Sequence, residues 1–412
     1  MRPLGAHLNS LLEIIPDGSI LPLYLESRNI LETPVSYDLA VAISVIGAGL
    51  KRSCWIDQEA FRIYPNISSL LVGHSGIGKD TAIDGGEAII QNLGLCKIIG
   101  GRTSETILEA LYQLGDPAVA VIMAGEFSEF FGPKDYQKGM MEVITEVMST
   151  KAYKDISLKS TGERRIMKPT LTMLGGSTKE WLHTAMPEHA MSGGFYPRFL
   201  IVCEDQTKRT VPWVRYSISE QERDAAKGAK EAFYTGLRDA LGVCSAIGEM
   251  VPREGAIEAY ERFYNERMGL FSSQASPYAH RCRDHVLRIA MVSAVCRYRQ
   301  YIDRHDIEFA AQFMGYLGQR IDDALAPPTV HARIHKEVLK LLPATRSYIW
   351  RILAKRYSVN DLERVLKSME HEEKLITRAT GNDVYRLVQD VSEQSTHIFR
   401  SDSRQRNRAS SL

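Results

Sequence analysis

With 412 residues, the chain is long enough for two or three domains with an ample hydrophobic core. Its composition, 44% hydrophobic and 25% charged, is typical of a soluble globular protein. A net charge of +1 excludes a global electrostatic field that would attract polyanions, so any nucleic-acid surface must be local.

The chain shows neither a membrane segment nor a metal-binding motif. The longest apolar stretch, residues 39–50, is too short to span a bilayer, and residues 1–16 lack a signal-peptide pattern. The 6 cysteines form no Cys-x2-Cys pair, and the 11 histidines form no metal-ligand cluster. These features predict reduced thiols, a cytoplasmic location and no membrane partner.

Two regions are distinguished at the start of the chain. Residues 1–60 have helical character, and we expect a helical segment that packs on the next domain and carries no chemistry itself. Between residues 61 and 205, strand and helix patterns alternate. This alternation predicts an α/β fold built on a mostly parallel sheet.

A glycine-rich turn joins an apolar strand pattern at residues 69–72 to a helical pattern at residues 79–93. Its sequence is Gly73-His74-Ser75-Gly76-Ile77-Gly78-Lys79-Asp80-Thr81. The Gly-x4-Gly-Lys spacing is that of a P-loop, in which backbone N–H groups and a helix N-terminus surround phosphates and the lysine reaches the β and γ phosphates. Asp80 occupies the usual Ser/Thr position, so a glycine turn without a ligand stays the alternative interpretation.

The strongest strand pattern, residues 118–123, ends in Ala124-Gly125-Glu126. In P-loop ATPases, the strand beside the P-loop usually ends in Asp-Glu, where the aspartate serves Mg²⁺ and the glutamate activates water. Here Gly125 replaces the aspartate. Either Glu126 is the catalytic base and Asp80 partly replaces the missing carboxylate, or the site binds ATP and hydrolyses it poorly. An exposed Glu126 that merely opens a loop is the third possibility, with Glu129 as the fallback carboxylate.

A basic hairpin is predicted over residues 155–168, with a turn that contains glycine. Its candidate phosphate-binding cations are Lys159, Arg164, Arg165 and Lys168. Such a hairpin could project into a central pore and grip nucleic-acid phosphates, or it could simply present a solvated face.

Two further polar positions adjoin predicted strands. The strand at residues 170–176 ends in Ser177, whose hydroxyl can hydrogen-bond a γ-phosphate or the attacking water. A glycine pair at residues 193–194 precedes Arg198, which stands just before an apolar strand. A guanidinium there could reach a neighbouring subunit's γ-phosphate, or it could form a local surface ion pair.

In this order, the motifs resemble those of phage- and plasmid-borne primase–helicase-like ATPases over residues 30–320. More distantly, they resemble minichromosome maintenance helicases and other AAA+ helicases. The resemblance implies that Glu126 activates water, Ser177 is the sensor-1 residue and Arg198 is an arginine finger acting across a subunit interface. It also implies that Lys79 and Thr81 bind nucleotide, and Thr81 and Asp80 are the candidate Mg²⁺ ligands, although Asp80 departs from the family pattern. The implied nucleotide-binding residues are Gly73, Ser75, Gly76, Gly78, Lys79, Asp80, Thr81 and Arg281.

Residues 206–330 carry helical periodicity and are predicted to form the helical lid of an AAA+ protein. Arg281 and Arg288 are spaced to share one helix face. By resemblance, Arg281 is the sensor-2 arginine, which contacts the γ-phosphate when the lid closes. Ordinary helix-surface arginines are the alternative.

Pro327-Pro328 marks a boundary, after which residues 331–390 are predicted to form a winged helix. Residues 331–389 hold twelve Lys and Arg against seven Asp and Glu, a balance of +5. Arg364 and Lys367 lie outside the core stripe of the third helix and are candidate DNA contacts, although winged helices also dock proteins. The tail, residues 391–412, is predicted to be a disordered basic segment.

Three functions are consistent with these motifs. The first is an ATP-dependent DNA helicase, translocase or remodelling ATPase of a phage, plasmid or mobile element. It would act as a ring, expected to be a hexamer, with single-stranded DNA in the pore and duplex at the winged helix. The second is a nucleotide-gated helicase loader, scaffold or regulator. The third is a nucleotide kinase, because Gly-Lys-Asp-Thr also resembles the P-loop of bacteriophage deoxynucleotide kinases.

Overall fold

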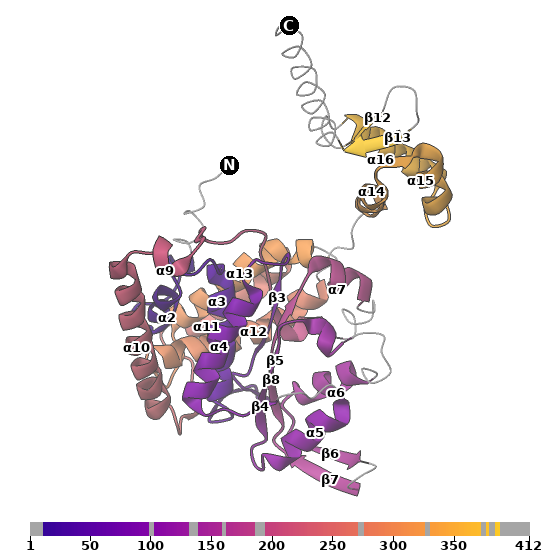
Figure 1. The fold of residues 1–412 in the computed structure, drawn as a ribbon. Helices are drawn as coiled ribbons and strands as arrows, with labels where there is room; N and C mark the ends of the chain where they lie inside the picture. The colour runs from indigo at the N-terminus through magenta and orange to yellow at the C-terminus, as the bar shows by residue number, and fades with distance from the viewer. Residues whose placement is uncertain are drawn as a thin grey trace, which may run out of the picture. The chain divides into compact units, whose positions relative to one another are not determined.

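The structure is a computed structural model, and its residues form two compact units, 1–326 and 327–412, each described by itself (Figure 1). The described residues are 11–98, 103–131, 139–158, 162–185, 194–270, 276–325, 330–371, 376–378 and 384–387. The predicted tail, residues 391–412, lies outside these ranges. Among the described residues, no helix has the length and apolar character needed to cross a membrane.

A five-stranded sheet forms the centre of the first unit, in the order β4-β5-β8-β3-β9. All its neighbouring strands pair in parallel, which confirms the parallel sheet predicted from the alternating pattern. The strands are β3 (Ser68–Val72), β4 (Lys97–Ile98), β5 (Val119–Ala124), β8 (Thr170–Ser177) and β9 (Phe199–Cys203). β3, β8 and β9 are fully buried, as expected for strands covered on both faces.

The order of the strands corrects one prediction. The strand that carries Glu126 was expected beside the P-loop strand, but β8 lies between β3 and β5. A glycine pair in β8 permits the close packing at the ends of these strands. A Cβ on Gly176 would lie 2.3 Å from the Gly125 carbonyl oxygen, and a Cβ on Gly175 would lie 2.6 Å from the Phe127 ring.

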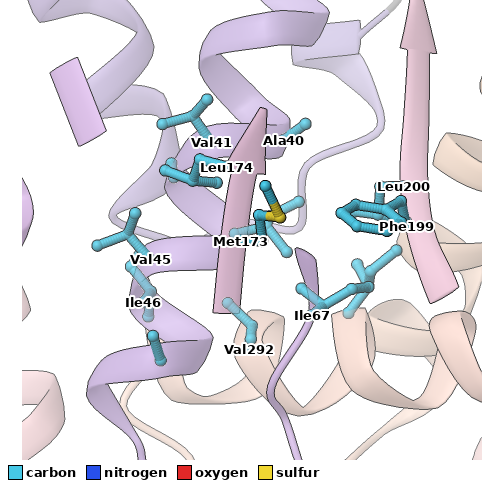
Figure 2. Packing of buried hydrophobic residues seen from close by; sticks show 14 of the residues in the cluster. Ala40, Val41, Val45, Ile46, Ile67, Met173, Leu174, Phe199, Leu200 and Val292 are labelled. Carbon is cyan, nitrogen blue, oxygen red and sulfur yellow. The ribbon is translucent and has the colours of Figure 1, made fainter. Parts of the chain in front are cut away.

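Four long helices pack around the sheet: α3 (Val35–Gly49), α4 (Lys79–Leu93), α12 (Ser276–Cys296) and α13 (Arg304–Leu325). α3 and α4 pack on each other and on β8, and α13 packs on β9 and α12. Figure 2 shows Leu174 of β8 directed toward Val41 of α3, while Met173 points the other way, toward Phe199 of β9. Nearly every residue of α3 is buried, which explains its mostly apolar sequence; the polar residues Ser36, Asp38 and Ser44 are buried with the others.

Further helices complete the unit: α2 (Leu21–Ser27), α5 (Ser104–Gln113), α6 (Met140–Val147), α7 (Lys179–Ala185), α9 (Val214–Ser217), α10 (Glu220–Val243) and α11 (Ala256–Glu266). A capping box between Ser219 and Glu222 fixes the start of α10, which packs against α2. The helices expected to form a lid share one continuous hydrophobic core with the sheet.

The prediction of a purely helical segment over residues 1–60 is wrong at its end. Residues 54–57 form β1 (Cys54–Asp57), which pairs antiparallel with β2 (Arg62–Ile63) and parallel with β10 (Gly248–Glu249). β10 lies far along the chain, so no local pattern signals this pairing.

The second unit contains three helices and a small sheet with the order β11-β13-β12. Its elements are α14 (Val330–Leu341), β11 (Ala344–Thr345), α15 (Arg346–Leu353), α16 (Val359–His371), β12 (Ile376–Arg378) and β13 (Val384–Leu387). It has its own core, including Ile349, Leu362 and Met369.

Candidate functional site

The P-loop, residues 73–79, connects β3 to α4 at the edge of the sheet where the parallel strands end, called here the carboxyl edge. Gly76 and Gly78 adopt φ values of +85° and +93°, which side chains rarely tolerate, and Gly78 is the N-cap of α4. The loop therefore turns directly into a helix N-terminus, where unpaired N–H groups and the helix dipole favour an anion.

Lys79 is the first residue of α4, and it is buried against the loop, with 8% of its surface exposed. Its Nζ donates hydrogen bonds to the carbonyl oxygens of Gly73 and His74, both at 2.9 Å. Burial lowers the pKa of Lys79, and the carboxylates of Asp80 and Glu126 act in the opposite direction. A cation thus lies inside the loop, held only by neutral carbonyls, with two carboxylates nearby.

The two departures from the usual P-loop pattern lie next to each other. A Cβ on Gly125 would lie 3.0 Å from Oδ1 of Asp80, and a Cβ on Gly176 would lie 3.6 Å from Cβ of Lys79. Asp80 therefore places a carboxylate beside the position where the usual strand aspartate would begin. Asp80 and Thr81 are exposed in the first turn of α4, as are Ser75 and Gly76 in the loop.

Ser177 and Glu126 join the P-loop at the same edge. Ser177 ends β8 and is buried, and its carbonyl oxygen accepts a hydrogen bond from the Gly73 backbone N–H at 3.2 Å. Glu126 follows β5 and is exposed. The carboxyl edge therefore brings together the loop, Lys79, Asp80, Ser177 and Glu126.

Arg198 lies at the opposite edge, where the strands begin. β3 and β9 run in parallel with Ser68 beside Phe199 and Val72 beside Cys203. Arg198 immediately precedes β9, whereas the P-loop immediately follows β3. Five strand residues rise by about 13 Å. Within one chain, the length of a strand therefore separates Arg198 from the P-loop.

Arg198 lines a cavity of about 780 Å³ at this amino edge, which we call the arginine pocket. Its Nη1 donates to the Gly194 carbonyl at 2.6 Å, and its Nη2 donates to Oγ of Ser149 at 3.1 Å. Among the described residues that line the pocket, Asp284 is the one carboxylate. The cations that line it are Arg52, Arg62, Lys151, Lys168, Arg198, Arg281 and Arg288.

The structure places Arg281, the predicted sensor-2 arginine, at the edge of the sheet away from the P-loop of its own chain. Arg281 lines the arginine pocket and forms an ion pair with Asp284 at 3.3 Å. Two contacts fix this part of α12 to β9 and the turn before it. The His285 Nε2 lies 2.8 Å from the Pro197 carbonyl oxygen, and the Tyr278 hydroxyl accepts from the Ile201 N–H at 3.3 Å.

The positive charges of the arginine pocket are compensated only in part: Arg62, Lys151 and Lys168 pair with carboxylates outside the lining, and Arg281 pairs with Asp284. Burial lowers the pKa of Arg198 to about 10, and the neighbouring Arg281 acts in the same direction. Burial also lowers the pKa of Arg288 to about 10, and Asp284 offsets this only in part. The side-chain amide of Asn66 lines the pocket, is 4% exposed and has no hydrogen-bond partner. Such surroundings favour an anion.

The cations of the predicted hairpin have partners within the chain. The hairpin forms as β6 (Tyr153–Leu158) and β7 (Gly162–Met167). Arg164 pairs with Glu109 at 2.8 Å, Arg165 with Asp155 at 2.6 Å and Lys168 with Asp116 at 3.0 Å. These carboxylates reduce the positive charge offered to a polyanion. Lys159 lies outside the described residues.

In the second unit, Arg364 and Lys367 are exposed on α16, while Leu362, Val365 and Leu366 of the same helix are buried. The two cations therefore lie off the packed face of the helix, as the periodicity predicted. Within the part of the chain that the structure describes, no group of three or more His, Cys, Asp or Glu side chains is arranged to hold a metal ion.

Several residues of the site were missed in the sequence. Asn66 and His285 carry no motif, and their place in the arginine pocket depends on contacts between distant segments. Arg28 donates a hydrogen bond from Nη2 to the Thr81 carbonyl at 2.5 Å, a contact that no spacing signals. For Arg288, the sequence did indicate partial burial, because apolar residues flank this arginine on a predicted helix.

Comparisons with known proteins give little further information. No family model matches the chain, and no curated protein matches it. Among solved structures, a full-length MCM homolog from Methanopyrus kandleri is similar at 14% identity and a TM-score of 0.41. The match covers 79% of this chain and 63% of that one.

Replacing His285 is expected to change the pH dependence of stability. Burial lowers its pKa from 6.5 to about 4, so between these pH values the unfolded chain binds a proton that the folded chain excludes. Stability should therefore fall as the pH falls from 6.5 to 4, by on the order of 3 kcal/mol from this group. His285→Gln keeps a donor for the Pro197 carbonyl but cannot titrate.

Urea unfolding of the wild-type protein and the variant at pH 4.5, 5.5 and 7 measures the difference. We expect the variant to lose less stability than the wild-type protein across this range. Parallel pH profiles for the two proteins would contradict a buried, neutral His285.

Proposed function

We propose that this chain is an ATPase of AAA+ type that acts on DNA and assembles head to tail with copies of itself. One observation carries the proposal: a P-loop with a buried lysine lies at one edge of a parallel sheet, and an incompletely compensated arginine pocket lies at the other edge. The motif order described above supports the DNA helicase, translocase or remodelling class within this group.

The carboxyl edge fits a nucleoside triphosphate. The helix N-terminus and the positive-φ glycines expose backbone N–H groups, and Lys79 can exchange its two loop carbonyls for phosphate oxygens. Thr81 and Asp80 would hold Mg²⁺ together with the phosphates, which suits an ion that needs only one or two protein oxygens. When bound, Mg²⁺ neutralises charge that develops on the phosphates.

Three residues of the chain have separate roles in hydrolysis. Lys79 binds the β and γ phosphates, and the exposed Glu126 carboxylate orients the attacking water and accepts its proton. The Ser177 hydroxyl, at the end of the strand between them, hydrogen-bonds the γ-phosphate or the water. Burial of Lys79 strengthens its attraction for phosphate because less water screens the charge.

Arg198 cannot act on the triphosphate of its own chain, because the two lie at opposite edges of the sheet. A heterologous contact between two copies would bring the P-loop of one against the arginine pocket of the next, and such contacts close into rings when the rotation permits. Arg198 and Arg281 would then both contact the neighbouring γ-phosphate. A hexamer is the ring size we propose.

The second unit would bind DNA. Three helices and a three-stranded sheet with a basic balance fit a winged helix, and α16 carries the exposed cations Arg364 and Lys367. The hairpin would bind nucleic acid more weakly as a pore loop, because its cations already pair with carboxylates. Arg164, Arg165 and Lys168 would have to exchange these carboxylates for phosphates.

Gly125 favours a second candidate function. Without the usual strand aspartate, the site would bind ATP tightly and hydrolyse it at a background rate, as a nucleotide-gated loader, scaffold or regulator does. The ATPase rate with and without single-stranded DNA separates the two candidates. Tight binding with background turnover identifies the regulator.

Substitutions at the two edges should have different effects. Lys79→Ala is expected to abolish ATP binding, whereas Arg198→Ala is expected to preserve binding and lower kcat roughly a thousandfold, as for other arginine fingers. Titration with a fluorescent ATP analogue and steady-state ATPase assays measure both.

Lys227→Ala and Arg238→Ala, which change exposed residues of α10, are the matched controls and should behave as the wild-type protein does. Native mass spectrometry with and without a non-hydrolysable ATP analogue tests assembly. ATP turnover that survives Lys79→Ala would rule out the proposed site.

The neighbouring positions Asp80 and Gly125 are expected to be coupled. Asp80→Ser removes the carboxylate beside Gly125, and we expect kcat to fall at least tenfold. Gly125→Asp added to it supplies the usual strand aspartate and should restore most of the activity. A coupling of roughly 1–3 kcal/mol is typical of residues in contact. Unchanged or higher activity of Asp80→Ser would contradict a Mg²⁺ role for Asp80.

A further inference from the structure

The end of α2, the start of α3 and the turn between them, residues 24–38, lie against the P-loop and α4 at several points; we call this stretch the support segment. The Tyr37 hydroxyl donates to the Val72 carbonyl at 2.7 Å, and a Cβ on Gly73 would lie 2.6 Å from the same hydroxyl. A Cβ on Gly78 would lie 3.3 Å from Cα of Thr33. Both ends of the loop are thus in contact with this segment.

Arg28 connects the support segment to the first turn of α4. Its Nη2 donates to the Thr81 carbonyl at 2.5 Å, and its Nε donates to Oδ1 of Asp38 in α3 at 3.0 Å. A Cβ on Gly85, one turn further along α4, would lie 3.0 Å from Cζ of Arg28. The Arg28 guanidinium is therefore packed tightly between Asp38 of α3 and the first two turns of α4.

A second cation, Lys208, contacts both Arg28 and Asp38. Lys208, in the stretch that follows β9, donates from Nζ to the Arg28 carbonyl at 2.8 Å and lies 3.6 Å from Oδ2 of Asp38. The side chains of Lys208 and Asp38 are 6% and 0% exposed. Buried ions of this kind contribute little net stability compared with apolar side chains, so their value lies in fixing a geometry.

We propose that Arg28 is a positioning residue of the nucleotide site, holding Thr81 where its hydroxyl can serve Mg²⁺. This inference rests on the proposed function. Arg28 contacts neither the P-loop lysine nor the loop amides, but it fixes the residue two positions after Lys79 through that residue's own backbone. Loss of Arg28 should therefore weaken binding of the magnesium–nucleotide complex more than binding of the nucleotide alone.

The test compares affinities for a fluorescent ADP analogue with Mg²⁺ and with a chelator. Arg28→Met keeps the length of the side chain but removes the guanidinium. Outer-sphere partners of a metal ligand typically change metal affinity by about tenfold or more. We expect Arg28→Met to raise the Kd with Mg²⁺ about tenfold and the Kd without Mg²⁺ less than about twofold.

Two further variants complete the design. Arg28→Lys keeps a charge opposite Asp38 but replaces the separate Nε and Nη2 donors of the guanidinium with a single Nζ, so we expect the same loss. Arg209→Met is the matched control, because Arg209 donates to the Asn29 carbonyl and pairs with Glu222 without reaching α4. Circular dichroism melting identifies any variant that fails to fold, in which case Arg28→Lys carries the test.

The outcomes separate the two proposals. If the wild-type protein binds no nucleotide in either condition, the proposed function fails. If the wild-type protein binds and both Arg28 variants bind the magnesium complex equally well, the positioning role fails alone. An equal loss with and without Mg²⁺ would also overturn that role, because it would mean that Arg28 supports the whole loop.

Discussion

The parallel pairing of β3 with β8 and β9 is the constraint on which the rest of the first unit depends. Parallel strands begin at one edge of a sheet and end at the other, so residues after β3 and residues before β9 must lie apart. The P-loop and Arg198 are separated for this reason alone. Under the proposed function, Arg198 therefore reaches a triphosphate only at the P-loop of a second copy of the chain.

Most of the carboxyl edge could be predicted because its signals are local. Glycine spacing before Lys79, and strand patterns that end in Ser177 and Glu126, each need only a short window of sequence. The edge on which strands end follows from parallel pairing. The order of the strands could not be predicted from these local signals, because the placement of β8 between β3 and β5 depends on contacts among all three strands.

The features that sequence reasoning missed all depend on distant segments. β1 pairs with β10, Arg281 of α12 lines the same pocket as Arg198, and Arg28 at the end of α2 donates to Thr81 of α4. Counting charges within the hairpin overestimated the positive charge that it offers to a polyanion. Glu109 and Asp116, which lie outside the hairpin in the sequence, pair with two of its cations. Hydrophobic periodicity predicts which face of a helix or strand a residue lies on, but it does not predict which distant segment packs against that face.

Mixing two inactive variants tests the central claim most directly. Lys79→Ala chains keep the arginine and Arg198→Ala chains keep the lysine, so a mixed assembly contains junctions in which both are intact. Subunit mixing should restore ATPase activity to on the order of a quarter of the wild-type rate, since a heterologous junction draws one group from each copy. If the mixture stays as inactive as its components, the two edges do not form a shared site.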